Sequence, residues 1–69
     1  MERTPVISSN IASVGYDTDS QTLEIEFNNG TIYQYFDVSE QVFNELKSAG
    51  SAGGYLASNI KGKYRYSRV

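Results

Sequence analysis

Residues 23–36 read as a β-hairpin, and this stretch constrains the fold of the chain more than any other. Residues 22–27 alternate polar and apolar side chains, the period of two that places one face of a strand in a core. An Asn-Asn-Gly sequence follows, and these residue types tolerate the positive φ of a tight turn. Residues 31–36 are β-branched or aromatic apart from one glutamine, as in strands. The stretch therefore predicts two antiparallel strands.

The length of the turn decides which side chains share a face of the hairpin. A three-residue loop with Gly30 in a G1 bulge places Phe27 opposite Thr31, and Tyr33 and Tyr35 then join the apolar face of the first arm. A two-residue loop would leave both tyrosines on the side of the glutamates. We predict the three-residue loop because it collects the apolar side chains on one face.

A weaker strand precedes the hairpin. Residues 10–16 alternate less regularly, and Gly15 within them indicates a bulge or a close backbone approach. The turn-forming residues 17–20 join this strand to the hairpin as an antiparallel meander. Residues 1–7 contain a proline, which cannot donate to a sheet ladder, so we expect a flexible lead-in there and a single domain over residues 8–69.

After the hairpin, the apolar spacing changes to that of a helix. Apolar residues recur at intervals of three and four over residues 42–49, which predicts an amphipathic helix. A capping box starting at Asp37, or Ser39 as an alternative cap, would begin it, and Gly50 is expected as its left-handed C-cap. A second, glycine-weakened helix is expected over residues 51–61, and the tail beyond it is a last strand or an extended arm. The fold class is therefore α+β, a three-stranded antiparallel β-meander packed against one or two α-helices.

The composition argues against an enzyme. The chain has no histidine and no cysteine, so the common general base and the common thiol nucleophile are missing. Glu24 and Glu26 share a strand face, but a solvated face is the expected role, because carboxylates act in catalysis only where their pKa is shifted. Asp17 and Asp19 resemble the start of a calcium loop whose later glycine and glutamate are absent. We expect no catalytic residue, no metal and no cofactor.

The same composition bears on location. Without cysteine there is no disulfide framework, which fits a reducing compartment. No apolar run approaches the roughly 18 residues of a membrane span, and the first residues lack the basic-then-apolar pattern of a signal peptide. We therefore expect a cytoplasmic protein without membrane contact.

The charge distribution points to the C-terminal segment as a binding site. Residues 60–69 carry four cationic side chains and no acidic one, although the net charge of the whole chain is −2. Two tyrosines alternate with these cations, and aromatic faces beside cations serve single-stranded nucleic-acid platforms for stacking and phosphate contact. The candidate RNA-binding residues are Lys61, Lys63, Tyr64, Arg65, Tyr66 and Arg68.

A protein-interaction module is the alternative function. In the predicted hairpin register, Ile32, Gln34 and Phe36 point away from the apolar face and would be exposed if no helix covers them. Such a surface could bind a protein partner or a second copy of the chain, and self-association would help so small a core.

The order of these motifs resembles the KTSC family, a short domain named for its place at the C-terminus of some lysyl-tRNA synthetases. The family also occurs as stand-alone small proteins of bacteria and phages. Tyr33 and Tyr35 correspond to its YxY motif, whereas Ser39 stands where proline is common and Lys61 where arginine is common. The resemblance implies the fold, and the synthetase context implies RNA, such as tRNA, as a partner. The other matching residues are Ser8, Ser9, Ile11, Val14, Gly15, Tyr16, Asp17, Leu23, Ile25, Phe27, Gly30, Gln34, Val38, Leu46, Ser51, Gly53, Tyr55, Ile60 and Tyr64.

Overall fold

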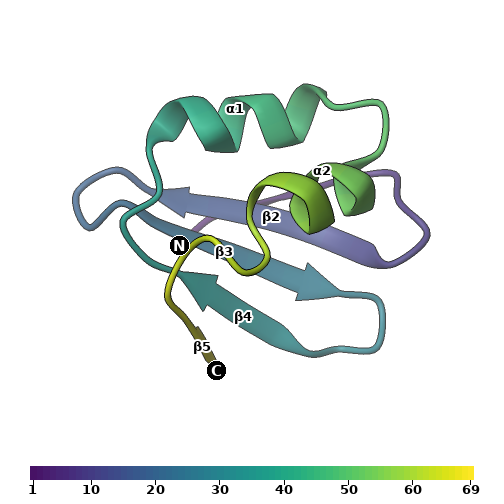
Figure 1. Ribbon diagram of the computed structural model, residues 1–69. Helices are drawn as coiled ribbons and strands as arrows, with labels where there is room; N and C mark the ends of the chain where they lie inside the picture. Colours follow the sequence, from purple (N-terminus) through teal and green to yellow (C-terminus); the bar gives the residue numbers. More distant parts are fainter.

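The predicted hairpin forms the centre of the sheet. In the computed structural model, which describes residues 1–69, its arms are β3 (Thr22–Phe27) and β4 (Ile32–Tyr35). β2 (Ile11–Asp17) pairs with the other edge of β3, and every neighbouring pair in the five-stranded sheet is antiparallel. The strands follow one another in chain order, and Figure 1 shows β2 to β5 in that order.

The turn has the predicted three-residue geometry. The N–H of Gly30 donates to the carbonyl of Phe27 at 2.9 Å, and the N–H of Phe27 donates to the carbonyl of Thr31 at 2.8 Å. Gly30 has a φ of 89°, the left-handed conformation that a G1 bulge requires. Tyr33 therefore stands opposite Ile25, one position in a register that gives the hairpin a single apolar face.

The prediction of three strands is wrong, because the sheet has five. β1 (Arg3–Pro5) pairs with β2 and lies within the expected lead-in, where its proline occupies an edge strand, a position that needs no second ladder partner. β5 (Tyr66–Arg68) pairs with β4, so the tail is a last strand rather than an extended arm. Both added strands are only three residues long, too short for a period of two to be visible in the sequence.

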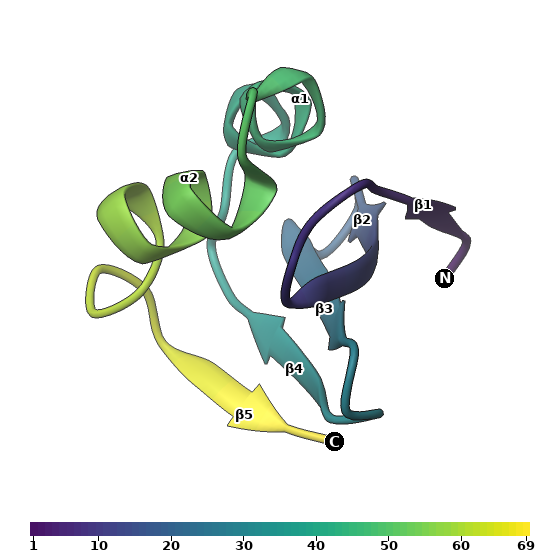
Figure 2. The same cartoon turned by 90° about the vertical axis from the view of Figure 1, so that its right-hand side faces the viewer.

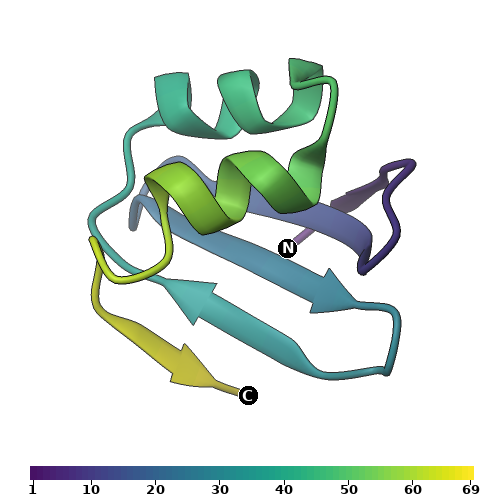
Figure 3. The ribbon, with the colours of Figure 1, turned by 45° about the vertical axis from the view of Figure 1, so that its right-hand side comes forward.

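Both predicted helices are present and lie on the same side of the sheet (Figures 2 and 3). α1 (Glu40–Ser48) begins after Ser39, the alternative cap, whereas Asp37 adopts a left-handed φ of 59° and lies outside the helix. The predicted left-handed cap at Gly50 is wrong: Ala49 is the C-cap, its backbone is extended, and Gly50 has no positive φ. α2 (Ala52–Asn59) begins after its N-cap Ser51, whose side chain accepts the N–H of Gly54.

The core lies between the sheet and these helices. Tyr16 of β2 stacks on Phe43 of α1 with ring centroids 5.3 Å apart, and its hydroxyl donates to the carbonyl of Val38. Tyr55 of α2 donates its hydroxyl to Glu45 of α1 at 2.6 Å, which ties the two helices together and raises the pKa of Tyr55 to about 12. The buried apolar residues are Ile11, Val14, Leu23, Ile25, Tyr35, Val38, Leu46, Ala52, Leu56 and Ile60.

Gly15 makes the close approach that the sequence indicated, whereas the bulge in β2 lies nearby, between Ile11 and Ser13. A Cβ at Gly15 would lie 2.7 Å from the backbone carbonyl oxygen of Glu2, so a larger residue must displace β1. We expect Gly15→Ala to lower the free energy of unfolding by about 1–3 kcal/mol. Urea unfolding measures this loss, and amide hydrogen exchange should show faster exchange in β1.

A second glycine supplies the control for this substitution. Gly50 has open space around it and no positive φ, so Gly50→Ala should leave stability unchanged or raise it slightly. Equal stability of Gly15→Ala and Gly50→Ala would show that β1 does not depend on the close approach.

Candidate functional site

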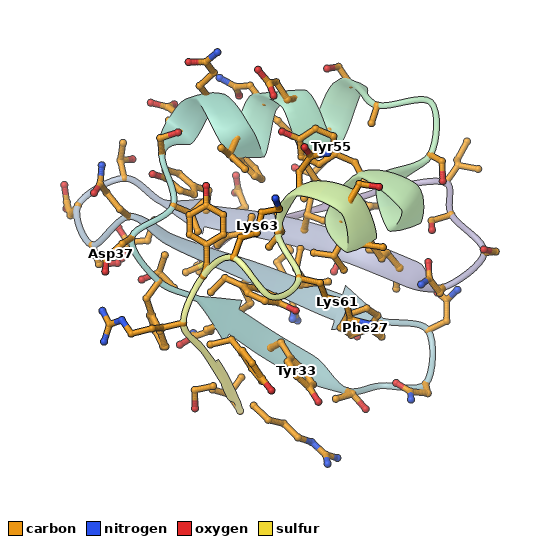
Figure 4. All side chains as sticks on the ribbon, in the orientation of Figure 1. Phe27, Tyr33, Asp37, Tyr55, Lys61 and Lys63 are labelled. Atoms are coloured by element: carbon orange, nitrogen blue, oxygen red, sulfur yellow. The ribbon has the colours of Figure 1, made fainter.

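A pocket of about 350 Å³ opens on the helix side of the sheet, between the β3–β4 turn, the end of α2 and β5. Figure 4 shows Lys61 on the side of Phe27 and Tyr33, far from Asp37. We call this site the aromatic pocket. Its lining consists of three rings, two cations and two small polar residues from the turn: Phe27, Tyr33, Tyr35, Lys61, Arg68, Asn29 and Thr31.

Tyr33 is the centre of an aromatic cluster that forms one wall of the pocket. Its ring meets Phe27 edge to face with centroids 5.8 Å apart, and it stacks against Tyr66 at 5.6 Å and Tyr35 at 6.4 Å. The pairing of β4 with β5 sets this arrangement, because Tyr35 stands opposite Tyr66 and Tyr33 opposite Arg68. Tyr35 is buried, but the side chain of Tyr66 is 59% exposed on the edge strand.

The electrostatic character of the pocket is positive. Lys61 comes from the turn after α2 and Arg68 from β5, and no acidic side chain lines the pocket. Burial, together with Tyr33 and Tyr66, raises the pKa of Tyr35 above its usual value, so this hydroxyl stays protonated at neutral pH. The pocket thus offers aromatic faces, cationic donors and neutral hydroxyl groups.

The six basic and aromatic residues predicted in the tail do not form one surface. Arg65 lies away from the pocket, where it pairs with Asp37 at 2.8 Å and covers the ring of Phe36. Tyr64 is half-buried against the core, and Lys63 is exposed in the turn between α2 and β5. Of the predicted set, the structure brings Lys61 and Arg68 together at the pocket and places Tyr66 beside it.

The alternative surface on the other side of the sheet is polar rather than apolar. Gln34 donates its amide to Glu24 at 2.9 Å, and Glu24 also pairs with Arg3 at 3.3 Å. Ile32 lies two residues before Gln34 in the chain and Phe36 lies two residues after it. The guanidinium group of Arg65 covers the Phe36 ring. The three predicted residues therefore form no continuous apolar patch.

Sequence reasoning missed the turn residues of the pocket. The sequence assigns Asn29 and Thr31 a role only in turn geometry, and Phe27 a role only in the apolar face of the hairpin. Tyr33 and Tyr35 correspond to a family motif, but nothing in the sequence links them to the basic tail. The pairing of β4 with β5 brings these tyrosines next to the basic tail. This pairing is not visible in the sequence, because β5 is only three residues long.

Residues 7–64 match the family model described as the KTSC domain. The chain belongs to the KTSC domain family. A crystal structure of a KTSC domain protein from Yersinia pestis superposes with a TM-score of 0.95 at 41% identity, covering 99% of this chain and 96% of that one. The family resemblance seen in the sequence is thereby confirmed. β5 follows the matched residues, so Tyr66 and Arg68 lie outside the KTSC match.

KTSC relatives occur in two contexts. An uncharacterised protein of Stutzerimonas stutzeri is 39% identical over all of this chain and 99% of its own length. Lysine–tRNA ligases of Trichormus variabilis and of a Nostoc species are 43% and 41% identical over 78% and 86% of this chain. The match spans only 10% of each ligase. No helix of this KTSC domain has the length and apolar character needed to cross a membrane.

Proposed function

We propose that this KTSC domain is a non-enzymatic module that binds unpaired RNA at the aromatic pocket. The observation that carries the proposal is the stack of Tyr33 and the exposed Tyr66, flanked by Lys61 and Arg68 with no acidic side chain in the lining. Proteins bind single-stranded nucleic acid by stacking bases on aromatic side chains while cations contact the phosphates.

Two further points support RNA as the ligand. Homologous segments occur within lysine–tRNA ligases, proteins named for a tRNA substrate. The net charge of −2 makes general attraction to polyanions weak, so binding must depend on the local cations at the pocket. A site of this kind favours unpaired loops and ends over duplexes, because only unpaired bases expose a face for stacking.

The test is a fluorescence-polarisation titration of a labelled single-stranded RNA, with unlabelled total tRNA as competitor, at low and at physiological salt. In the Lys61→Ala/Arg68→Ala double variant we expect affinity to fall about tenfold at physiological salt. The slope of log affinity against log salt should also decrease by about 1.4, because each lost phosphate contact removes about 0.7 for single strands.

The chain offers a matched control for this charge change. Lys63→Ala/Arg65→Ala also removes one lysine and one arginine from the C-terminal segment, so the change in net charge is equal. The side chains of Lys63 and Arg65, however, lie outside the pocket. The control should bind nearly as well as the wild type, since the exposed Arg65–Asp37 pair adds little stability. Equal losses in the two double variants, or no RNA binding by the wild type at low salt, would contradict the proposal.

A further inference from the structure

The amide of Asn29 has a fixed orientation at the rim of the aromatic pocket. Its Oδ1 accepts the backbone N–H of Thr31 at 3.0 Å, inside a turn held by two backbone hydrogen bonds, one between Phe27 and Thr31 and one between Gly30 and Phe27. This bond uses one of the two lone pairs of the oxygen and leaves the amide nitrogen with two hydrogens to donate. Asn29 therefore presents donors to a ligand in the pocket.

The two cationic side chains of the lining are also donors. Lys61 and Arg68 donate hydrogen bonds and cannot accept them. The hydroxyls of Thr31, Tyr33 and Tyr35 can act either way, and the lining contains no carboxylate. Acceptors on a ligand can pair with every one of these side chains, whereas donors on a ligand find acceptors only at the hydroxyls and at the second lone pair of the Asn29 oxygen.

The size and shape of the pocket fit a single base. Its volume of about 350 Å³ is near the lower end of the range of about 300–1,000 Å³ for small-molecule sites. The edge-to-face contact of Phe27 with Tyr33 makes a corner of two rings next to the turn. A base stacked in this corner lies in the same pocket as the donors of the turn residue Asn29 and of Lys61.

We infer that the pocket selects bases with a carbonyl group at pyrimidine C4 or purine C6, uracil and guanine, over cytosine and adenine, which carry an amino group at that position. This inference rests on the proposed RNA-binding function. Guanine presents O6 and N7 as acceptors and uracil presents O4, whereas cytosine and adenine place an amino donor at the corresponding position. An amino group placed against the Asn29 amide nitrogen or Lys61 cannot accept a hydrogen bond, so it forgoes the bond that a carbonyl group makes there.

Octauridine and octacytidine provide the direct comparison, because they have equal length and charge and differ in each base by O4 against N4 and by the N3 proton. In a fluorescence-polarisation titration of the wild-type domain, we expect octauridine to bind about tenfold more tightly. Equal affinities would overturn the inference and leave the proposed function intact. No binding of either RNA would overturn the proposed function itself, so the two failures are distinguishable.

Asn29→Asp tests whether the amide nitrogen of Asn29 is responsible for the preference between the two RNAs. Aspartate keeps an oxygen for the Thr31 N–H and replaces the amide donors with an acceptor, so the turn is preserved. The added negative charge lowers the affinity for both RNAs. The readout is therefore the ratio of the affinity for octauridine to the affinity for octacytidine. The ratio should fall to about one or invert in favour of octacytidine. A ratio that stays at the wild-type value would show that Asn29 does not read the base, and would overturn the inference.

Discussion

Leu46→Ala is expected to lower the free energy of unfolding by about 3 kcal/mol, because it leaves a cavity where α1 packs on the sheet. Leu46 is the one fully buried residue of α1, and its exposed fraction is 0%. Alanine keeps the helix propensity, so the loss comes from packing alone. For a domain of this size, such a loss should lower the melting temperature by about 12–24 °C. Urea and thermal unfolding followed by far-UV circular dichroism measure both quantities.

Two variants of α1 separate this packing effect from helix propensity. Leu46→Met conserves volume and should cost less than about 1.5 kcal/mol. Asn44→Ala changes an exposed position of the same helix and should stay within about 0.5 kcal/mol of the wild type. If Leu46→Ala unfolds at the same urea concentration as Asn44→Ala, the packing of α1 against the sheet is not what holds the helix.

The sequence predicts the local parts of this fold because their determinants are local. The hairpin register follows from a period of two and from the left-handed Gly30, both contained in fifteen consecutive residues, 22–36. The helix of residues 40–48 follows in the same way from the spacing of its apolar side chains. Its ends are less predictable: Gly50 resembles a C-cap, but the extended Ala49 already turns the chain toward α2.

The candidate site depends on contacts that the sequence does not display. Gly62 adopts a left-handed φ of 79° and reverses the chain after α2, which carries the tail back along β4. The alternation of β5 then sends Tyr66 and Arg68 to the helix side, while Arg65 meets Asp37 beyond the end of β4. A basic tail considered as one patch in the sequence is thereby divided into two surfaces.

Tyr66→Ala is expected to weaken RNA binding about 30-fold, because stacking of one base on an aromatic ring contributes about 1–3 kcal/mol. Tyr66 is 59% exposed on the edge strand and stacks on Tyr33, so its outer face is open to a base. The same exposure means that the substitution removes little buried area, and the melting temperature should change by only a few degrees. Fluorescence polarisation with single-stranded RNA measures the affinity, and a thermal melt verifies the fold.

Two conservative variants at this position distinguish stacking from other contributions of the side chain. Tyr66→Phe keeps the ring and loses the hydroxyl, and it should bind nearly as tightly as the wild type. Tyr66→Leu keeps an apolar side chain without a π face, and it should bind about as weakly as Tyr66→Ala, because base stacking needs a flat aromatic surface. Full affinity in Tyr66→Leu would mean that the residue acts through apolar contact or strand pairing. Loss of affinity in Tyr66→Phe would assign the contribution to the hydroxyl instead of the ring.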